Sequence, residues 1–183
     1  MSMRCLILKE YYLNTSDISS WVKTVKAGDR VFLSGIVYTA RDAAHKRIAD
    51  ALKNKAELPF DLNNSVIYYA GPTPTPDGLS IGSCGPTTSS RMDPYAPLLM
   101  ENGLKCMIGK GERNRSVCDA IIKNGAVYLC AIGGAGALAA KSIVSCEVIA
   151  YEDLGCESVK KLEFKNFPLI VAIDSVGGNL FEK

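Results

Sequence analysis

Cationic and hydroxyl side chains concentrate where we expect strands to end, in three short segments: TARDAAHKR at 39–47, GPTTSSRMD at 85–93 and MIGKGER at 107–113. Arg41, Arg91 and Lys110 supply fixed positive charge, and an arginine fork matches a carboxylate through two parallel hydrogen bonds. Thr87 adds a hydroxyl close to Gly85, whose missing side chain lets a ligand approach the backbone. These residues indicate a binding site for a small molecule that carries two carboxylates.

Each of these side chains also has a purely structural interpretation. Arg41 and Arg91 could cap helices or form surface pairs with Asp42 and Asp93, and exposed pairs add little stability. His45 follows Arg41 by four residues on one face of an expected helix, so it could join the site or be a buried histidine with satisfied hydrogen bonds. The sequence leaves both interpretations open. Lys110 is different, because the two glycines beside it leave its ammonium group uncovered.

A glycine-rich turn offers an alternative of another functional class. Residues Gly134–Ala139 match the pattern G-x-G-x-x-A, follow a strand-like segment and open an alanine-rich helix, as in dinucleotide-binding folds. Only about one further strand-helix unit follows the motif, whereas a nucleotide-binding module continues through several. A purely structural interpretation is that the glycines allow a tight turn. A third interpretation is that the exposed N–H groups at the helix start face an anion in a nearby site without binding a nucleotide.

The elements that must position these residues alternate between apolar strands and helices from about residue 31 onward, which predicts an α/β domain. The strand candidates share short apolar runs: 31–37, 66–70, 106–108, 127–132, 146–150 and 169–173. Residues 71–91 contain four prolines and four glycines, which predicts a long loop. Such a loop within a compact domain is either a mobile excursion or a functional segment.

The expected helices have recognisable ends. Thr39 with Asp42 three residues later is typical of a capping box, and Asp93 followed by Pro94 is typical of a helix start. A third helix is predicted to begin at a capping Asn114 and to close at Asn124-Gly125.

Composition bounds the remaining function classes. The 183 residues, 48% of them hydrophobic, suit one domain spanning 1–183, and the dispersed net charge of +2 argues against a nucleic-acid partner. No apolar run approaches membrane-spanning length, so we expect a cytoplasmic protein that does not bind membranes. Seven cysteines, an odd count with at least nine residues between neighbours, predict free thiols and no metal site made by this chain alone.

Taken together, these sequence motifs resemble those of the beta subunit, or C-terminal domain, of class I iron-sulfur fumarate hydratases and the related L-tartrate dehydratases. The resemblance covers nearly the whole chain, through LSGIVYTARDAAHKR, GPTTSSRMDPY, MIGKGER, AIGGAGALAAKSI and FPLIVAIDSVGGNLFE. It implies a single swivelling β/β/α domain of the aconitase-like type. Asn114 departs from the family's usual serine after the KG-x-R word, which affects only the local helix cap.

The resemblance also implies roles for individual residues. It assigns substrate binding to Arg41 and Arg91, the catalytic base to Thr87 and a catalytic positive charge to Lys110; we add His45 and Gly85 as candidate substrate-binding residues. It places a 4Fe-4S cluster on three cysteines of a partner, an alpha-type subunit or domain, and none on this chain. The expected reaction is reversible hydration of fumarate to (S)-malate, with tartrate or another hydroxy-dicarboxylate as the alternative substrate.

The same resemblance makes this chain an incomplete enzyme. Initiation at Met1 leaves roughly thirty residues before the first motif, too few for a cluster-bearing domain, so we expect the partner to be a separate chain. The expected assembly is a hetero-oligomer, with self-association as an option for the isolated chain.

Overall fold

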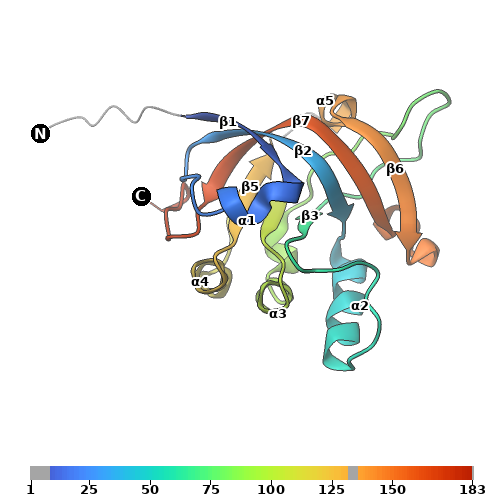
Figure 1. The fold of residues 1–183 in the computed structure, drawn as a ribbon. Helices are drawn as coiled ribbons and strands as arrows, with labels where there is room; N and C mark the ends of the chain where they lie inside the picture. Colours follow the sequence, from blue (N-terminus) through green and yellow to red (C-terminus); the bar gives the residue numbers. More distant parts are fainter. Residues whose placement is uncertain (1–8, 132–135, 183) are drawn as a thin grey trace, which may run out of the picture.

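Seven strands form one sheet in the computed structural model, which describes residues 9–131 and 136–182 (Figure 1). The order across the sheet is β1-β2-β3-β4-β5-β7-β6. The strands are β1 Glu10–Asn14, β2 Arg30–Thr39, β3 Val66–Tyr68, β4 Cys106–Gly109, β5 Val127–Ala131, β6 Ile143–Ala150 and β7 Val159–Ile173.

The direction of the strands determines where the candidate residues meet. Strands β1 to β5 run parallel, each to its neighbour, whereas β7 runs antiparallel to β2, β5 and β6. Because β7 pairs with both β2 and β5, the strands β2, β3, β4, β5 and β7 close into a ring. The carboxyl ends of β2, β3 and β4 therefore lie next to one another at one end of this ring.

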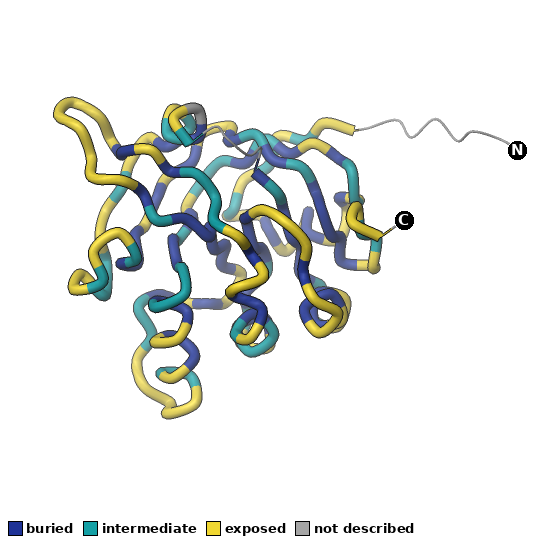
Figure 2. The backbone as a smooth tube through the Cα atoms, turned by 180° about the vertical axis from the view of Figure 1, so that it is seen from behind, coloured by how far each residue is buried: buried dark blue, intermediate teal, exposed yellow. Residues whose placement is uncertain are grey.

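Two apolar clusters occupy opposite faces of the strands. Within β3, Val66 and Tyr68 belong to one cluster and Ile67 to the other, as the two-residue period of a strand requires. The first cluster contains Tyr68, Phe164 and Phe167, whose rings pack against one another. The second lies between the strands and the helices α2, α3 and α4, which Figure 1 shows on the same side of the sheet. Figure 2 shows the exposed outer turns of these helices and the exposed loop between β3 and α3.

The helices are short. They are α1 Ile18–Trp21, α2 Asp42–Lys53, α3 Ala96–Glu101, α4 Arg115–Asn124 and α5 Gly136–Lys141, with 3-10 turns η1 Thr15–Asp17, η2 Ser89–Met92 and η3 Glu152–Glu157. The predicted ends of α4 are confirmed. The Asn114 side chain accepts a hydrogen bond from the Val117 N–H, and Gly125 closes the helix in the left-handed region at φ +59°. Within the described residues, no helix is both long and apolar enough to cross a membrane.

Two predicted helix starts are wrong. Thr39 does not cap α2, because it is the buried last residue of β2, where its hydroxyl donates to the Ser158 carbonyl and accepts from the Lys160 N–H. Asp93 does not cap α3, which begins at Ala96 with Tyr95 at the N-cap position. The capping pattern is local, whereas both side chains are engaged by residues far away in the sequence.

The expected α/β domain is confirmed as a mixed α/β fold with a seven-stranded sheet. All six predicted strands form, but β7 begins ten residues before the predicted 169–173, and β1 was not predicted. The swivelling movement of this domain stays a prediction. Gly134 and Ala135 of the glycine-rich turn lie outside the described residues, and α5 begins at Gly136.

Candidate functional site

The three cationic segments meet at the carboxyl ends of β2, β3 and β4, and we call this region the cationic edge. Arg41 follows β2 at the start of α2, and Lys110 follows β4 directly. The segment that carries Thr87 crosses both neighbouring strands, because the Thr87 N–H donates to the Tyr69 carbonyl at 2.7 Å and Thr88 bridges to Lys110. The structure therefore brings together segments that lie about seventy residues apart in the sequence, at the end of parallel strands where α/β sites form.

Arg91 makes the most informative contacts of the edge. It lies in the 3-10 turn η2, and its Nη2 donates to the Thr87 hydroxyl oxygen at 2.9 Å and to Asp42 Oδ2 at 2.8 Å. The Arg91 and Asp42 side chains are 45% and 39% exposed, so a ligand can reach them. A positive charge bonded to the hydroxyl oxygen stabilises its alkoxide form and leaves the O–H free to transfer its proton.

The Arg41 side chain lies against Gly71, where there is no room for a larger residue. A Cβ built on Gly71 would approach Arg41 Nη1 at 2.6 Å and Cδ at 2.9 Å, so any larger residue would displace the guanidinium. Arg41 Nη2 lies 3.6 Å from Glu157 Oε1, and the Arg41 side chain is 22% exposed. Its Nε is buried without a hydrogen-bond partner among the described residues.

Lys110 is exposed at the end of β4 and is fixed through its backbone. Its N–H donates to the Ser89 hydroxyl at 3.0 Å, and that oxygen also accepts from the Tyr128 hydroxyl at 2.8 Å. Gly109 permits this approach, since an added Cβ would collide with the Ser89 side chain. The ammonium group is thus carried on a backbone that Ser89 of η2 holds in place, and Tyr128 of β5 holds Ser89 in turn.

His45 and Gly85 lie beneath or beside the edge. The His45 side chain is completely buried, its Nδ1 lies 3.0 Å from the Arg41 carbonyl, and its ring packs edge-on against Tyr69. Burial lowers the pKa of His45 to about 4, so the ring is neutral at pH 7. Gly85 faces the start of α5, because a Cβ built on Gly85 would lie 3.5 Å from the Cα of Gly136. This placement favours a supporting role for His45 over contact with a ligand.

Sequence reasoning missed an ion pair below the edge. Arg113 Nε donates to Asp93 Oδ1 at 2.6 Å, and the two side chains are 0% and 4% exposed. The Arg113 guanidinium also lies 4.9 Å from the centre of the Tyr128 ring and 5.3 Å from that of Tyr69. Both charges lie within the quoted motifs, but no local pattern signals their burial. This pair joins the segment of η2 to the start of α4.

The described cysteines do not form an iron-sulfur site. Cys84 and Cys106 are buried, and burial raises the pKa of Cys84 to about 12 and raises that of Cys106 as well, which favours the thiol over the thiolate ligand. Residues 9–131 and 136–182 contain no group of three histidine, cysteine or carboxylate side chains arranged for a metal ion. The residues in these two ranges therefore do not offer the ligands of a 4Fe-4S cluster.

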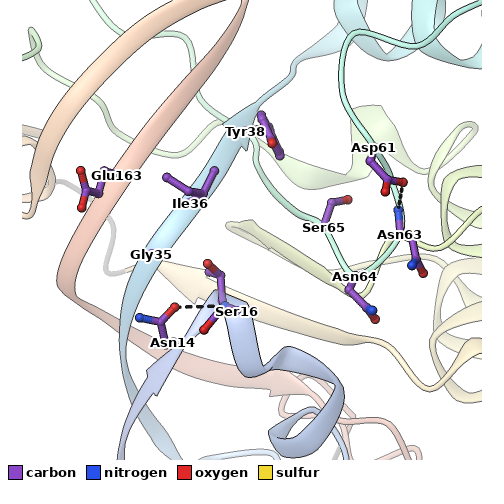
Figure 3. Close-up of a pocket in the computed structure, with 11 residues that line it drawn as sticks. Asn14, Ser16, Gly35, Ile36, Tyr38, Asp61, Asn63, Asn64, Ser65 and Glu163 are labelled. Atoms are coloured by element: carbon purple, nitrogen blue, oxygen red, sulfur yellow. Dashed lines mark hydrogen bonds between the residues drawn. The ribbon is translucent and has the colours of Figure 1, made fainter.

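A hollow lies beside β2, away from the predicted residues. Figure 3 shows Ile36 and Tyr38 of β2 between Glu163 of β7 and Asp61 of the loop after α2. Burial and the Asp61 carboxylate both raise the pKa of Tyr38. The lining contains two carboxylates and no lysine or arginine, so it would repel a dicarboxylate. The cationic edge is the better site for an anion.

Comparison with known proteins identifies relatives over most of the chain. The sequence profile of the family described as "Fumarase C-terminus" matches residues 7–183. "Fumarate hydratase 2" of Leishmania major is 42% identical over 158 residues, 85% of this chain and 28% of the relative. "Fumarate hydratase class I, anaerobic" of Escherichia coli K12 is 41% identical over 156 residues, 84% of this chain and 28% of the relative.

A third relative is similar in length to this chain. "Putative L(+)-tartrate dehydratase subunit beta" of Methanocaldococcus jannaschii is 42% identical over 168 residues, which are 88% of this chain and 86% of that protein. The chain thus corresponds to 28% of the length of the two fumarate hydratases and to most of a protein named as one subunit.

Proposed function

The chain belongs to the fumarase C-terminus family, and from this premise we propose that it supplies the substrate-binding half of the active site of a dicarboxylate hydro-lyase. The proposed reaction is reversible addition of water to fumarate, which gives (S)-malate. The observation that carries the proposal is the contact at 2.9 Å between Arg91 Nη2 and the Thr87 hydroxyl oxygen. That contact places a fixed cation on the candidate base.

Each residue of the cationic edge has a chemical task in this reaction. Arg41 and Arg91 bind the two carboxylates through their forked N–H groups. In the dehydration direction, the Thr87 alkoxide removes a proton from the carbon next to one carboxylate, and the electron pair moves onto that carboxylate. The pair then returns to form the carbon–carbon double bond as hydroxide leaves the neighbouring carbon on the side of the partner. Arg91 and Lys110 stabilise the charge that develops there. Thr87 returns the proton to carbon when water is added.

The other half of the site must come from a partner. The described thiols do not fit a cluster, and the chain covers 28% of the length of the fumarate hydratases it matches. We place a 4Fe-4S cluster on an alpha-type subunit or domain, where it would act as a Lewis acid on the substrate. The relative named as a beta subunit supports a two-chain assembly, so this chain alone is expected to be inactive.

A tartrate-type substrate is the second candidate. It is favoured by the relative that shares 86% of its length with this chain. Tartrate carries the same two carboxylates and would need the same two arginines, so the cationic edge accommodates either substrate class.

The deciding experiment is anaerobic reconstitution of this chain with the cluster-bearing chain of the same cell. Turnover of fumarate, malate and tartrate is then compared by ultraviolet absorbance and product analysis. We expect turnover of one dicarboxylate class, and its loss in Thr87→Val with assembly intact. Full activity in Thr87→Val would refute the base assignment. Affinity for NAD that is independent of Arg41 and Arg91, measured by calorimetry on the whole chain, would instead favour a nucleotide-binding module at Gly134–Ala139.

A further inference from the structure

We infer that Glu157 is the positioning residue for Arg41, holding its guanidinium in the orientation in which it receives a substrate carboxylate. This inference deepens the proposed function and rests on it. Glu157 is distant from Arg41 in sequence and reaches it only because the turn η3 folds back against the start of α2.

The two oxygens of Glu157 have different partners. Oε2 accepts a hydrogen bond from the Ala43 N–H at 3.0 Å, in the first turn of α2, where an anion is stabilised by the free N–H groups. Oε1 faces Arg41 Nη2 at 3.6 Å. The carboxylate is therefore fixed by the helix and presents its second oxygen to the guanidinium. One edge of Arg41 faces a resident anion, and the exposed part of the guanidinium remains for a ligand.

The turn that carries Glu157 is itself held from below. Lys160, which is buried, donates from Nζ to the Ser158 hydroxyl at 2.6 Å and to the Gly155 and Cys156 carbonyls at 3.2 and 3.3 Å. The Cys156 carbonyl oxygen also lies 3.1 Å from the ideal Cβ position of Gly71, over which Arg41 lies. Lys160 thus holds the end of η3 that carries Glu157, together with the Cys156 carbonyl beside Gly71.

A second contact holds the same turn to α2 without touching Arg41. Arg47 bonds to both carboxylate oxygens of Asp153, and its guanidinium lies 5.2 Å from the centre of the Tyr151 ring. The Arg47 and Asp153 side chains are 42% and 63% exposed. Asp153 therefore provides a matched control: its removal weakens the docking of η3 but leaves the carboxylate beside Arg41 in place.

The arrangement has a counterpart at the other arginine. Asp42 holds Arg91 at 2.8 Å, as Glu157 holds Arg41, and both carboxylates lie at the start of α2. Each substrate-binding arginine of the proposed site thus carries one resident carboxylate. Orienting a guanidinium before binding reduces the entropy lost when the ligand is bound.

The test compares Glu157→Gln, Glu157→Asp and Asp153→Asn in the reconstituted pair. Glu157→Gln keeps an oxygen that accepts from the Ala43 N–H but removes the negative charge that lies beside Arg41. Arg41 is proposed to bind the carboxylate equally well in the ground state and in the transition state. We therefore expect KM for the dicarboxylate to rise about tenfold and kcat to stay within about twofold of the wild type. Glu157→Asp should recover part of the affinity, and Asp153→Asn should stay within about twofold of the wild type. A KM in Glu157→Gln that matches either the wild type or Asp153→Asn overturns the inference.

A second measurement decides the matter without activity. Arg41 Nε is shielded from water, so its N–H proton should exchange slowly in nitrogen-15 spectra of the full chain. We expect faster exchange in Glu157→Gln and wild-type exchange in Asp153→Asn, with thermal melting as the control for folding. Unchanged exchange in Glu157→Gln would overturn the positioning role. If the wild-type pair turns over no dicarboxylate, the proposed function fails, while the exchange rates still show whether Glu157 orients Arg41.

Discussion

Two arginine–carboxylate pairs lie in the same part of the molecule and differ chiefly in burial. Arg113 and Asp93 are almost completely buried at 2.6 Å, whereas Arg91 and Asp42 are 45% and 39% exposed at 2.8 Å. Arg91 also touches the Thr87 hydroxyl, while Arg113 is packed against two tyrosine rings. The same chemical groups at nearly the same separation are therefore suited to different tasks.

The difference follows from the cost of removing charge from water. A buried charge that loses its partner has no solvent to replace it, so breaking the inner pair destabilises the folded chain. An exposed pair gains little from its own attraction, because water competes for both groups. Arg91 can therefore exchange or share its carboxylate partner with a ligand at small cost, and this freedom suits a substrate-binding residue.

Replacing Arg91 with methionine should give the largest effect on activity. We expect kcat/KM of the reconstituted pair to fall about a thousandfold, equivalent to about 4 kcal/mol, because substrate binding and the charge on Thr87 are both lost. The free energy of unfolding should change by less than about 0.5 kcal/mol, since the pair is exposed. Steady-state kinetics and urea titration measure the two quantities.

Arg91→Lys is the matched control for that change. It keeps the charge but not the fork, so its activity should lie between those of the wild type and Arg91→Met. Wild-type kinetics in Arg91→Met would place the substrate elsewhere and abolish the contrast between the two pairs.

Replacing Arg113 with methionine should have the largest effect on stability. Removing one member of a buried pair leaves Asp93 without its cation and costs about 3–5 kcal/mol of unfolding free energy. Urea unfolding followed by circular dichroism measures the loss. The double variant Arg113→Met with Asp93→Leu should regain much of it, because both charges are then absent. A single variant as stable as the wild type would show that the inner pair does not act as a unit.

His45 should make stability depend on pH in the acidic range. Burial lowers the pKa of His45 from 6.5 to about 4, so between these values the unfolded chain binds a proton that the folded chain does not. Stability therefore rises with pH across this window and is lost as the pH falls from 6.5 towards 4, at up to about 1.4 kcal/mol per unit and about 3 kcal/mol in total.

The comparison of the wild type with His45→Phe isolates this contribution. The unfolding free energy of the wild type minus that of His45→Phe should decrease as the pH falls from 6.5 to 4, because only the wild type carries the buried imidazole. A difference that is constant over that range would mean that His45 titrates normally in the folded chain.

The sequence predicted what depends on neighbours along the chain. The caps of α4 at Asn114 and Gly125 and the alternation of strands with helices follow from local patterns, and both are observed. It also placed Arg41, Thr87 and Lys110 at strand ends, since parallel strands bring such ends together. The roles of these residues remain predictions.

What the sequence missed depends on contacts between distant segments. The acceptor for the Ala43 N–H is Glu157, 114 positions away, and not the local Thr39 of the predicted capping box. The pairing of Asp93 with Arg113 likewise requires knowing that η2 packs beside the start of α4. Neither contact leaves a periodic or compositional signal, because a single carboxylate has the same appearance in a sequence whether it is exposed or buried.

The smallest expected effect belongs to a pair that is neither buried nor at the cationic edge. Arg115 Nε lies 2.9 Å from Asp119 Oδ1 on α4, with the two side chains 79% and 56% exposed. Asp119→Asn should lower the unfolding free energy by about 0.3–0.5 kcal/mol at most and leave kcat/KM unchanged. Urea titration at low and high salt checks the first expectation, since screening should erase even that difference. A loss comparable to that of Arg113→Met would mean that burial does not separate the inner pair from the outer ones.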